Sequence, residues 1–141
     1  MDKLNLLITI SVISMFTSLF LALFLVTVNT KHKLSNRLFA FFLVLSAIDM
    51  VGNLDSLIEL PLTARIFISS LFFLQLPTFY LYVLSVCYSD FKLKPKYLTH
   101  SFPFLLSNLI LLPRFYSVSP ESKIRFIKIG SSMPEIQFII F

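Results

Sequence analysis

Long uncharged apolar runs dominate the chain and predict helices that cross a membrane. The first run covers residues 4–28 without a charged side chain. As a helix it is about 37 Å long, which exceeds a bilayer core of about 30 Å. Further apolar runs are separated by short polar loops and lie at 38–58, which is interrupted by Asp49 and Asp55, and at 66–86 and 98–113. None of them alternates with the period of two that a strand requires, so the pattern predicts an all-α fold.

We interpret the runs as a polytopic transmembrane helical bundle with four spans, at about 4–28, 37–58, 63–89 and 97–114. Another apolar run begins at residue 136 and stops six residues later, at Phe141. A helix cannot cross a bilayer in six residues, so we expect a fifth span to begin at 136 in a chain that is truncated relative to its parent.

The composition agrees with a membrane protein and excludes several soluble classes. Hydrophobic residues make up 57% of the chain and charged residues 13%, compared with about 45–50% and about 25% in soluble proteins. The single cysteine and the two glycines cannot build a thiolate metal cluster or a glycine-rich phosphate loop. Because no Ser/His/Asp group, inward carboxylate pair or histidine-rich motif is visible, we expect no enzyme, metal or cofactor.

The net charge of +5 is interpreted as a topology signal, because the basic residues flank the apolar runs. The loops after the first and third runs hold Lys31, Lys33, Arg37, Lys92, Lys94 and Lys96. The N-terminus and the second loop hold only two basic residues. The positive-inside rule then predicts cytoplasmic first and third loops and an outside N-terminus, although the fourth loop is also basic.

Polar residues repeat every three or four positions on the second and third predicted spans. The second span carries Ser46, Asp49, Asn53 and Ser56. The third span carries Gln75, Thr78, Tyr82 and Ser85. This spacing places each set on one helix face. Counting depth from the expected inner helix ends puts Asp49 opposite Thr78, and Asn53 opposite Gln75.

Asp49 is the only ionisable side chain that this scheme puts near the middle of a span. We expect it to point into the bundle, where it either accepts hydrogen bonds from Thr78 and Tyr82 or is protonated. The two polar faces are interpreted as interhelical hydrogen bonds, with a ligand, signal or proton site centred on Asp49 as the open alternative.

Two other features predict how the helices pack. Ser14, Ser18 and Ala22 are spaced four apart on the first helix, which lets another helix approach closely. Pro77 removes a backbone donor inside the third span and is expected to kink it.

A family pattern is visible from Phe39 onward. The second span opens with Asn36-Arg-Leu-Phe-Ala-Phe-Phe-Leu. The third span contains Phe73-Leu-Gln-Leu-Pro-Thr-Phe-Tyr-Leu-Tyr, followed by a basic turn and His100-Ser-Phe-Pro-Phe. Over residues 34–141 the chain resembles the multi-helix N-terminal membrane region of bacterial AraC-type helix-turn-helix sensors, which is related to regions of sensor histidine kinases. The residues that match the pattern are Pro77, Tyr80, Tyr82, His100, Pro103 and Phe104. Leu76 replaces a glycine of that pattern.

The resemblance implies a sensory region in a bacterial inner membrane, with about seven spans in the complete protein and a cytoplasmic DNA-binding domain that this sequence lacks. The implied partners are the lipid bilayer and the remainder of the same chain, while a homodimer is left open. This region itself is expected to contact no nucleic acid. The alternative is a fragment of a transporter or channel whose pathway includes the Asp49 face.

Overall fold

The computed structural model describes residues 3–54, 58, 60–88, 90–119 and 121–124. All regular secondary structure in these ranges is helical. The α-helices are α1 (Lys3–Thr27), α2 (Lys33–Val51), α3 (Leu62–Ser70), α4 (Phe72–Cys87) and α5 (Phe102–Leu111). The shorter helical segments are η1 (Gly52–Leu54), η2 (Pro95–Ser101) and the π-helical η3 (Leu112–Tyr116). The expected fifth span from residue 136 lies outside the described residues.

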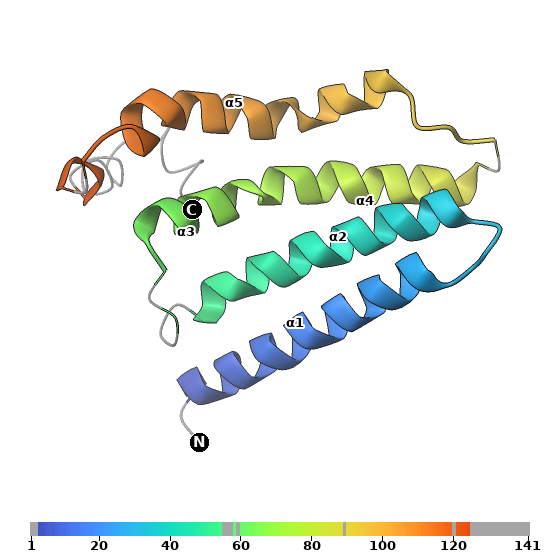
Figure 1. The fold of residues 1–141 in the computed structure, drawn as a ribbon, viewed down its shortest axis with the longest axis horizontal. Coiled ribbons are helices and arrows are strands. Elements are labelled where there is room, and N and C mark those ends of the chain that lie inside the picture. The colour runs from blue at the N-terminus through green and yellow to red at the C-terminus, as the bar shows by residue number, and fades with distance from the viewer. Residues whose placement is uncertain (1–2, 55–57, 59, 89, 120, 125–141) are drawn as a thin grey trace.

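The helices lie side by side in chain order, and α1 and α5 form the two edges of the layer (Figure 1). α1 packs along α2, α2 packs along α4, and α5 packs on both α3 and α4. Large apolar side chains cover the free surfaces, and Phe16 and Phe20 on α1 are 64% and 74% exposed. Water does not tolerate this much continuous apolar surface on a monomer, whereas lipid does.

Three helical stretches are long and apolar enough to cross a membrane, namely Asn5–Thr27, Lys33–Val51 and Leu62–Cys87. The last of these joins α3 and α4. The fourth predicted span, at 97–114, contains an α-helix of only ten residues, flanked by η2 and η3. The structure therefore supports an all-helical membrane protein with three such stretches.

The second helix occupies different residues from those predicted. It begins at Lys33, four residues before the expected start at 37, and its α-helical part ends at Val51, although we predicted a helix to 58. Lys33 and Arg37 can belong to the helix because their long aliphatic stems reach along apolar surface and carry the charge outward. At the other end, Gly52 is a weak helix former and begins the tighter η1 turn.

A serine interrupts the third predicted span. The Ser70 hydroxyl donates to the carbonyl of Phe67 at 2.7 Å, and the next backbone N–H, from Leu71, bonds to Ile68 at 3.0 Å. Leu71 thus makes a three-residue turn where an α-helix would make a four-residue one. α4 then continues through Pro77, and the kink expected there stays a prediction.

Small side chains hold α1 close to α2. Ser11 and Ala22 are buried on α1, and Ala40 and Ala47 are buried on α2, with Ala47 only 1% exposed. Ser14 and Ser18 of the predicted ladder are half-buried. This pattern agrees with close helix approach through small residues, as is common in membranes.

Candidate functional site

Aromatic side chains, with polar side chains at either end, line the contact between α2 and α4, which we call the α2–α4 seam. The seam is antiparallel, so residue numbers rise along α2 as they fall along α4. Its α2 members are Ser35, Phe39, Phe42 and Ser46. Its α4 members are Gln75, Phe79, Tyr82 and Ser85.

Hydrogen bonds close the seam at both ends. Near the basic loops, the Ser35 hydroxyl donates to the carbonyl of Ser85 at 3.1 Å. At the other end, Gln75 Nε2 donates to Ser46 Oγ at 2.7 Å. Ser46 Oγ in turn donates to the carbonyl of Phe42 at 3.0 Å. Ser46 Oγ is therefore the hydrogen-bond acceptor of the Gln75 amide, while the Ser46 hydroxyl has a second partner, the carbonyl of Phe42, on its own helix.

Stacked rings fill the middle of the seam. Phe39 and Tyr82 stack with ring centroids 4.6 Å apart and an interplanar angle of 20°. Phe42 and Phe79 lie 5.1 Å apart in a tilted arrangement. Each such pair contributes about 0.5–1.5 kcal/mol beyond the burial of its area, so the rings stabilise the contact between α2 and α4.

The observed register differs from the predicted one by seven positions on α2, because Gln75 meets Ser46 and not Asn53. Depth had been counted from helix ends near 37 and 89, whereas α2 begins at Lys33 and α4 ends at Cys87. Both differences shift the pairing in the same direction. The predicted register was therefore wrong, although four residues of the predicted polar faces do lie in the seam, namely Ser46, Gln75, Tyr82 and Ser85.

Asp49 is exposed and lies in the last turn of α2, two residues before Val51. Its carboxylate makes no hydrogen bond or ion pair within the described part of the chain. Thr78 is buried, but its hydroxyl donates to the carbonyl of Leu74 at 2.7 Å. The expected hydrogen bonds from Thr78 and Tyr82 to Asp49 are thus absent from the described residues. Asn53 lies in η1, and a ligand or signal role for these residues stays a prediction.

The fold brings two residues of the family pattern together. Tyr80 of α4 and His100 of η2 meet edge to face, with ring centroids 5.6 Å apart. The ring centroids of Tyr97 and His100, which both belong to η2, lie 6.3 Å apart. The Lys96 amine lies 5.3 Å from the centre of the Tyr97 ring. We call these four residues the η2 cluster. It ties the third hydrophobic stretch to the loop that carries Lys92, Lys94 and Lys96.

The other pattern residues have separate positions. Pro103 stands in the first turn of α5, where a proline fits without losing a helix hydrogen bond. Phe104 contacts Phe67 of α3 at 6.3 Å between ring centroids. Pro77 lies inside α4, and Tyr82 belongs to the α2–α4 seam.

Sequence reasoning missed the role of Asn108, which connects α3, α5 and η3. Its Nδ2 donates to Ser70 Oγ at 3.0 Å and to the carbonyl of Phe104 at 2.9 Å. The Tyr116 hydroxyl donates to Asn108 Oδ1 at 3.0 Å. Burial raises the pKa of the Tyr116 phenol, which keeps it a neutral donor. The signal was an asparagine inside an apolar run, opposite a serine inside another.

Within the described residues, no group of three or more His, Cys, Asp or Glu side chains could hold a metal ion. No family model, curated protein or solved structure matches the chain. The resemblance to AraC-type membrane sensors therefore rests on the pattern residues of the sequence alone and stays a prediction.

Proposed function

We propose that the chain is the membrane-embedded signal-input region of a bacterial transcriptional regulator with an AraC-type DNA-binding output. In this proposal it lies in the inner membrane with four spans and an outside N-terminus. Its partners are the lipid bilayer and the remainder of the same protein. The observation that carries the proposal is the contact between Tyr80 and His100, two pattern residues that lie twenty positions apart and meet at 5.6 Å.

The η2 cluster offers a route from the membrane to the cytoplasm. Tyr80 is part of α4, while His100 and Tyr97 belong to the segment that follows the basic loop. A tilt or slide of α4 would therefore displace η2 through the ring contacts, and with it the start of α5. Packed side chains of this kind can couple two positions of a helix if the contact has two stable arrangements.

Transport is the less supported alternative. Transporters place discontinuous helices and inward charges near the midplane of the membrane. The interruption at Leu71 keeps right-handed helical backbone angles and an N–H bonded to Ile68, so it frees no unwound carbonyls for an ion. Asp49 lies at the end of α2, about 24 Å from Lys33 at the other end.

Chromatin immunoprecipitation of the product of the complete gene, tagged and expressed in its host, tests this function. We expect enrichment at a small set of promoters, and a change of at least several-fold in their transcription when His100→Ala is introduced. His32→Ala is the matched control, because His32 is an exposed histidine in the α1–α2 loop. Membrane levels of both variants are compared by immunoblot.

Two results would contradict the proposal. One is the lack of any promoter enrichment for the full-length product. The other is an equal effect of His100→Ala and His32→Ala on transcription at equal membrane levels, which would remove the η2 cluster from the signalling route.

A further inference from the structure

We propose that the α1–α2 hairpin binds one anionic phospholipid, with its phosphate between Lys33 and Arg37 and an acyl chain in the groove between the two helices. This inference does not depend on the proposed regulatory function. Two adjoining cavities carry it, one polar and one apolar, and they share Val26 and Arg37.

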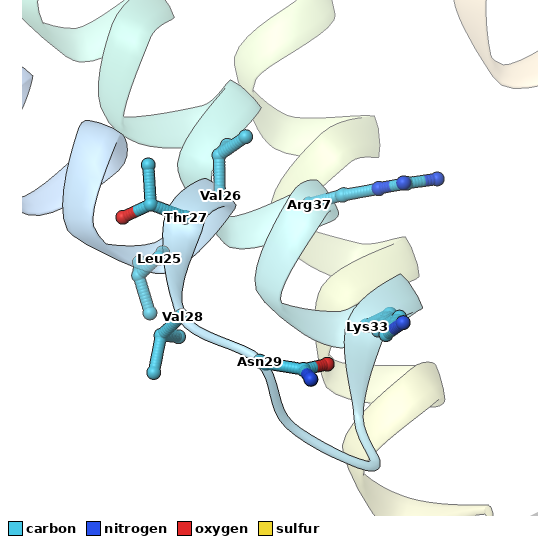
Figure 2. Close-up of a pocket in the computed structure, with 7 residues that line it drawn as sticks. All are labelled: Leu25, Val26, Thr27, Val28, Asn29, Lys33 and Arg37. Atoms are coloured by element: carbon cyan, nitrogen blue, oxygen red, sulfur yellow. The ribbon is translucent and has the colours of Figure 1, made fainter.

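The polar cavity has a volume of about 210 Å³ and lies where α1 turns into α2. Figure 2 shows that the polar ends of Asn29, Lys33 and Arg37 extend to the same side of the hairpin. Lys33 is the first residue of α2, and Arg37 follows one turn later on the same helix. No carboxylate in the described part of the chain pairs with either cation, so both charges are available to an anion.

The apolar cavity has a volume of about 460 Å³ and continues from the same place along both helices. Leu19 and Leu23 line it from α1, and Ala40 and Val44 line it from α2. The small side chain at Ala40 deepens the groove. From Arg37 to Val44 the groove extends about 10 Å along the helix axis, which is the direction in which an acyl chain runs from its headgroup into the bilayer.

The order of these features along the hairpin fits the order of chemical groups in a phospholipid. Arg37 lies about 6 Å deeper than Lys33, so the two cations flank the level at which the charged headgroup gives way to hydrocarbon. Arginine binds phosphate through two parallel N–H donors, and lysine adds a point charge. Basic pockets between membrane helices on the cytoplasmic side are recognised binding sites for anionic headgroups, and the positive-inside rule predicts that side for this hairpin.

Native mass spectrometry of the full chain, released from neutral detergent, tests the proposal. The added lipids are phosphatidylglycerol and, in a parallel sample, phosphatidylcholine. We expect one phosphatidylglycerol molecule to be retained in preference to phosphatidylcholine. The double variant Lys33→Gln/Arg37→Gln is expected to bind it about 30-fold more weakly, since each cation near a membrane surface contributes about fivefold.

The matched control is Lys92→Gln/Lys94→Gln, which removes the same charge from the basic loop after α4 and is expected to leave retention within about twofold. Equal losses from the two double variants would overturn the site, because binding would then follow overall charge. Equal retention of the two lipids would also overturn it. Competition by soluble glycerol 3-phosphate as strong as that by the lipid would show a free-anion site and reject the groove.

A second measurement on the unmodified protein keeps the proposal testable if the double variant does not fold. Phosphatidylglycerol with a photoreactive diazirine in its acyl chain is activated in vesicles that contain the full chain. We expect the label on the groove residues between Leu19 and Val26 of α1 and between Arg37 and Val44 of α2. Label confined to the other helices would overturn the assignment.

Discussion

Ser46→Ala is expected to destabilise the protein more than Gln75→Leu, although both remove the same hydrogen bond. Without Ser46, the Gln75 amide loses the acceptor that it meets at 2.7 Å and stays within the seam. Without Gln75, the Ser46 hydroxyl still donates to the carbonyl of Phe42 at 3.0 Å. The two substitutions therefore differ in whether they leave an unpaired polar group between packed helices.

The magnitudes follow from this asymmetry. An unpaired buried donor costs about 1–3 kcal/mol, while hydrogen bonds between membrane helices average about 0.6 kcal/mol and reach about 1.7 kcal/mol. We expect Ser46→Ala to lower the free energy of unfolding by about 1–2 kcal/mol and Gln75→Leu to lower it by less than about 0.5 kcal/mol. The double variant should resemble Gln75→Leu, so the coupling energy should equal the loss from Ser46→Ala, about 1–2 kcal/mol.

Unfolding of the four proteins in mixed micelles, followed by circular dichroism, measures these differences. Ser69→Ala is the control, because the exposed Ser69 hydroxyl donates only to the carbonyl of Arg65 on its own helix, at 3.1 Å. We expect that variant to change stability by less than about 0.5 kcal/mol. Additive single effects, or a larger loss from Gln75→Leu than from Ser46→Ala, would refute the assigned hydrogen bonds.

Four further substitutions test other parts of the layer by the same unfolding measurement. Ala47→Leu should cost about 1–3 kcal/mol, because Ala47 is 1% exposed and lies two helical turns from Ala40, on the α2 face that lines the groove with α1; an unchanged protein would show that α1 is not closely packed there. Asn108→Leu should cost about 2 kcal/mol, because the Tyr116 hydroxyl loses its acceptor, and Tyr116→Phe should cost less; the reverse order would be inconsistent with Asn108 as the connecting residue. Asp49→Asn should stabilise the protein by about 0.3–1 kcal/mol, since a negative charge in the last turn opposes the helix dipole; a loss of stability would mean that Asp49 has a partner.

Run lengths alone were enough to predict an all-helical membrane protein, because a bilayer requires long uncharged helices whatever the other details. The first helix was predicted to within one residue at each end, at 4–28 against Lys3–Thr27. The second was not, because in sequence alone a charged residue next to an apolar run indicates a loop. Lys33 and Arg37 belong to the helix instead, and a lysine or arginine near a helix end can do so at little cost.

The position at which α2 begins decided how much of the candidate site could be predicted. Gln75 and Tyr82 were identified from helical spacing and do face α2. Ser46 was identified in the same way, but its pairing with Gln75 was not, because spacing gives a helix face whereas the register depends on where both helices end. Asp49 illustrates the consequence: a residue expected near the middle of a span lies in the last turn of a shorter helix.

The Ser70–Asn108–Tyr116 connection could not be predicted for a different reason. It depends on tertiary contacts between α3, α5 and η3, and on a π-helical turn that places Tyr116 beside Asn108 eight residues away. Periodicity calculated for a regular α-helix does not anticipate such a turn.

Site-directed cross-linking of α2 to α4 tests the central structural claim, the register of the α2–α4 seam, most directly. In a Cys87→Ser background, one protein carries Ser46→Cys and Gln75→Cys, and a second carries Asp49→Cys and Thr78→Cys. Thr78 lies three residues from Gln75 along α4, and Asp49 three residues from Ser46 in the opposite sense, so the second pair is offset by about 9 Å along the helix axes. With a short thiol-specific cross-linker in native membranes, we expect efficient cross-linking of the first pair only. Preferential cross-linking of the second pair would contradict the structure and restore the register in which Asp49 faces Thr78.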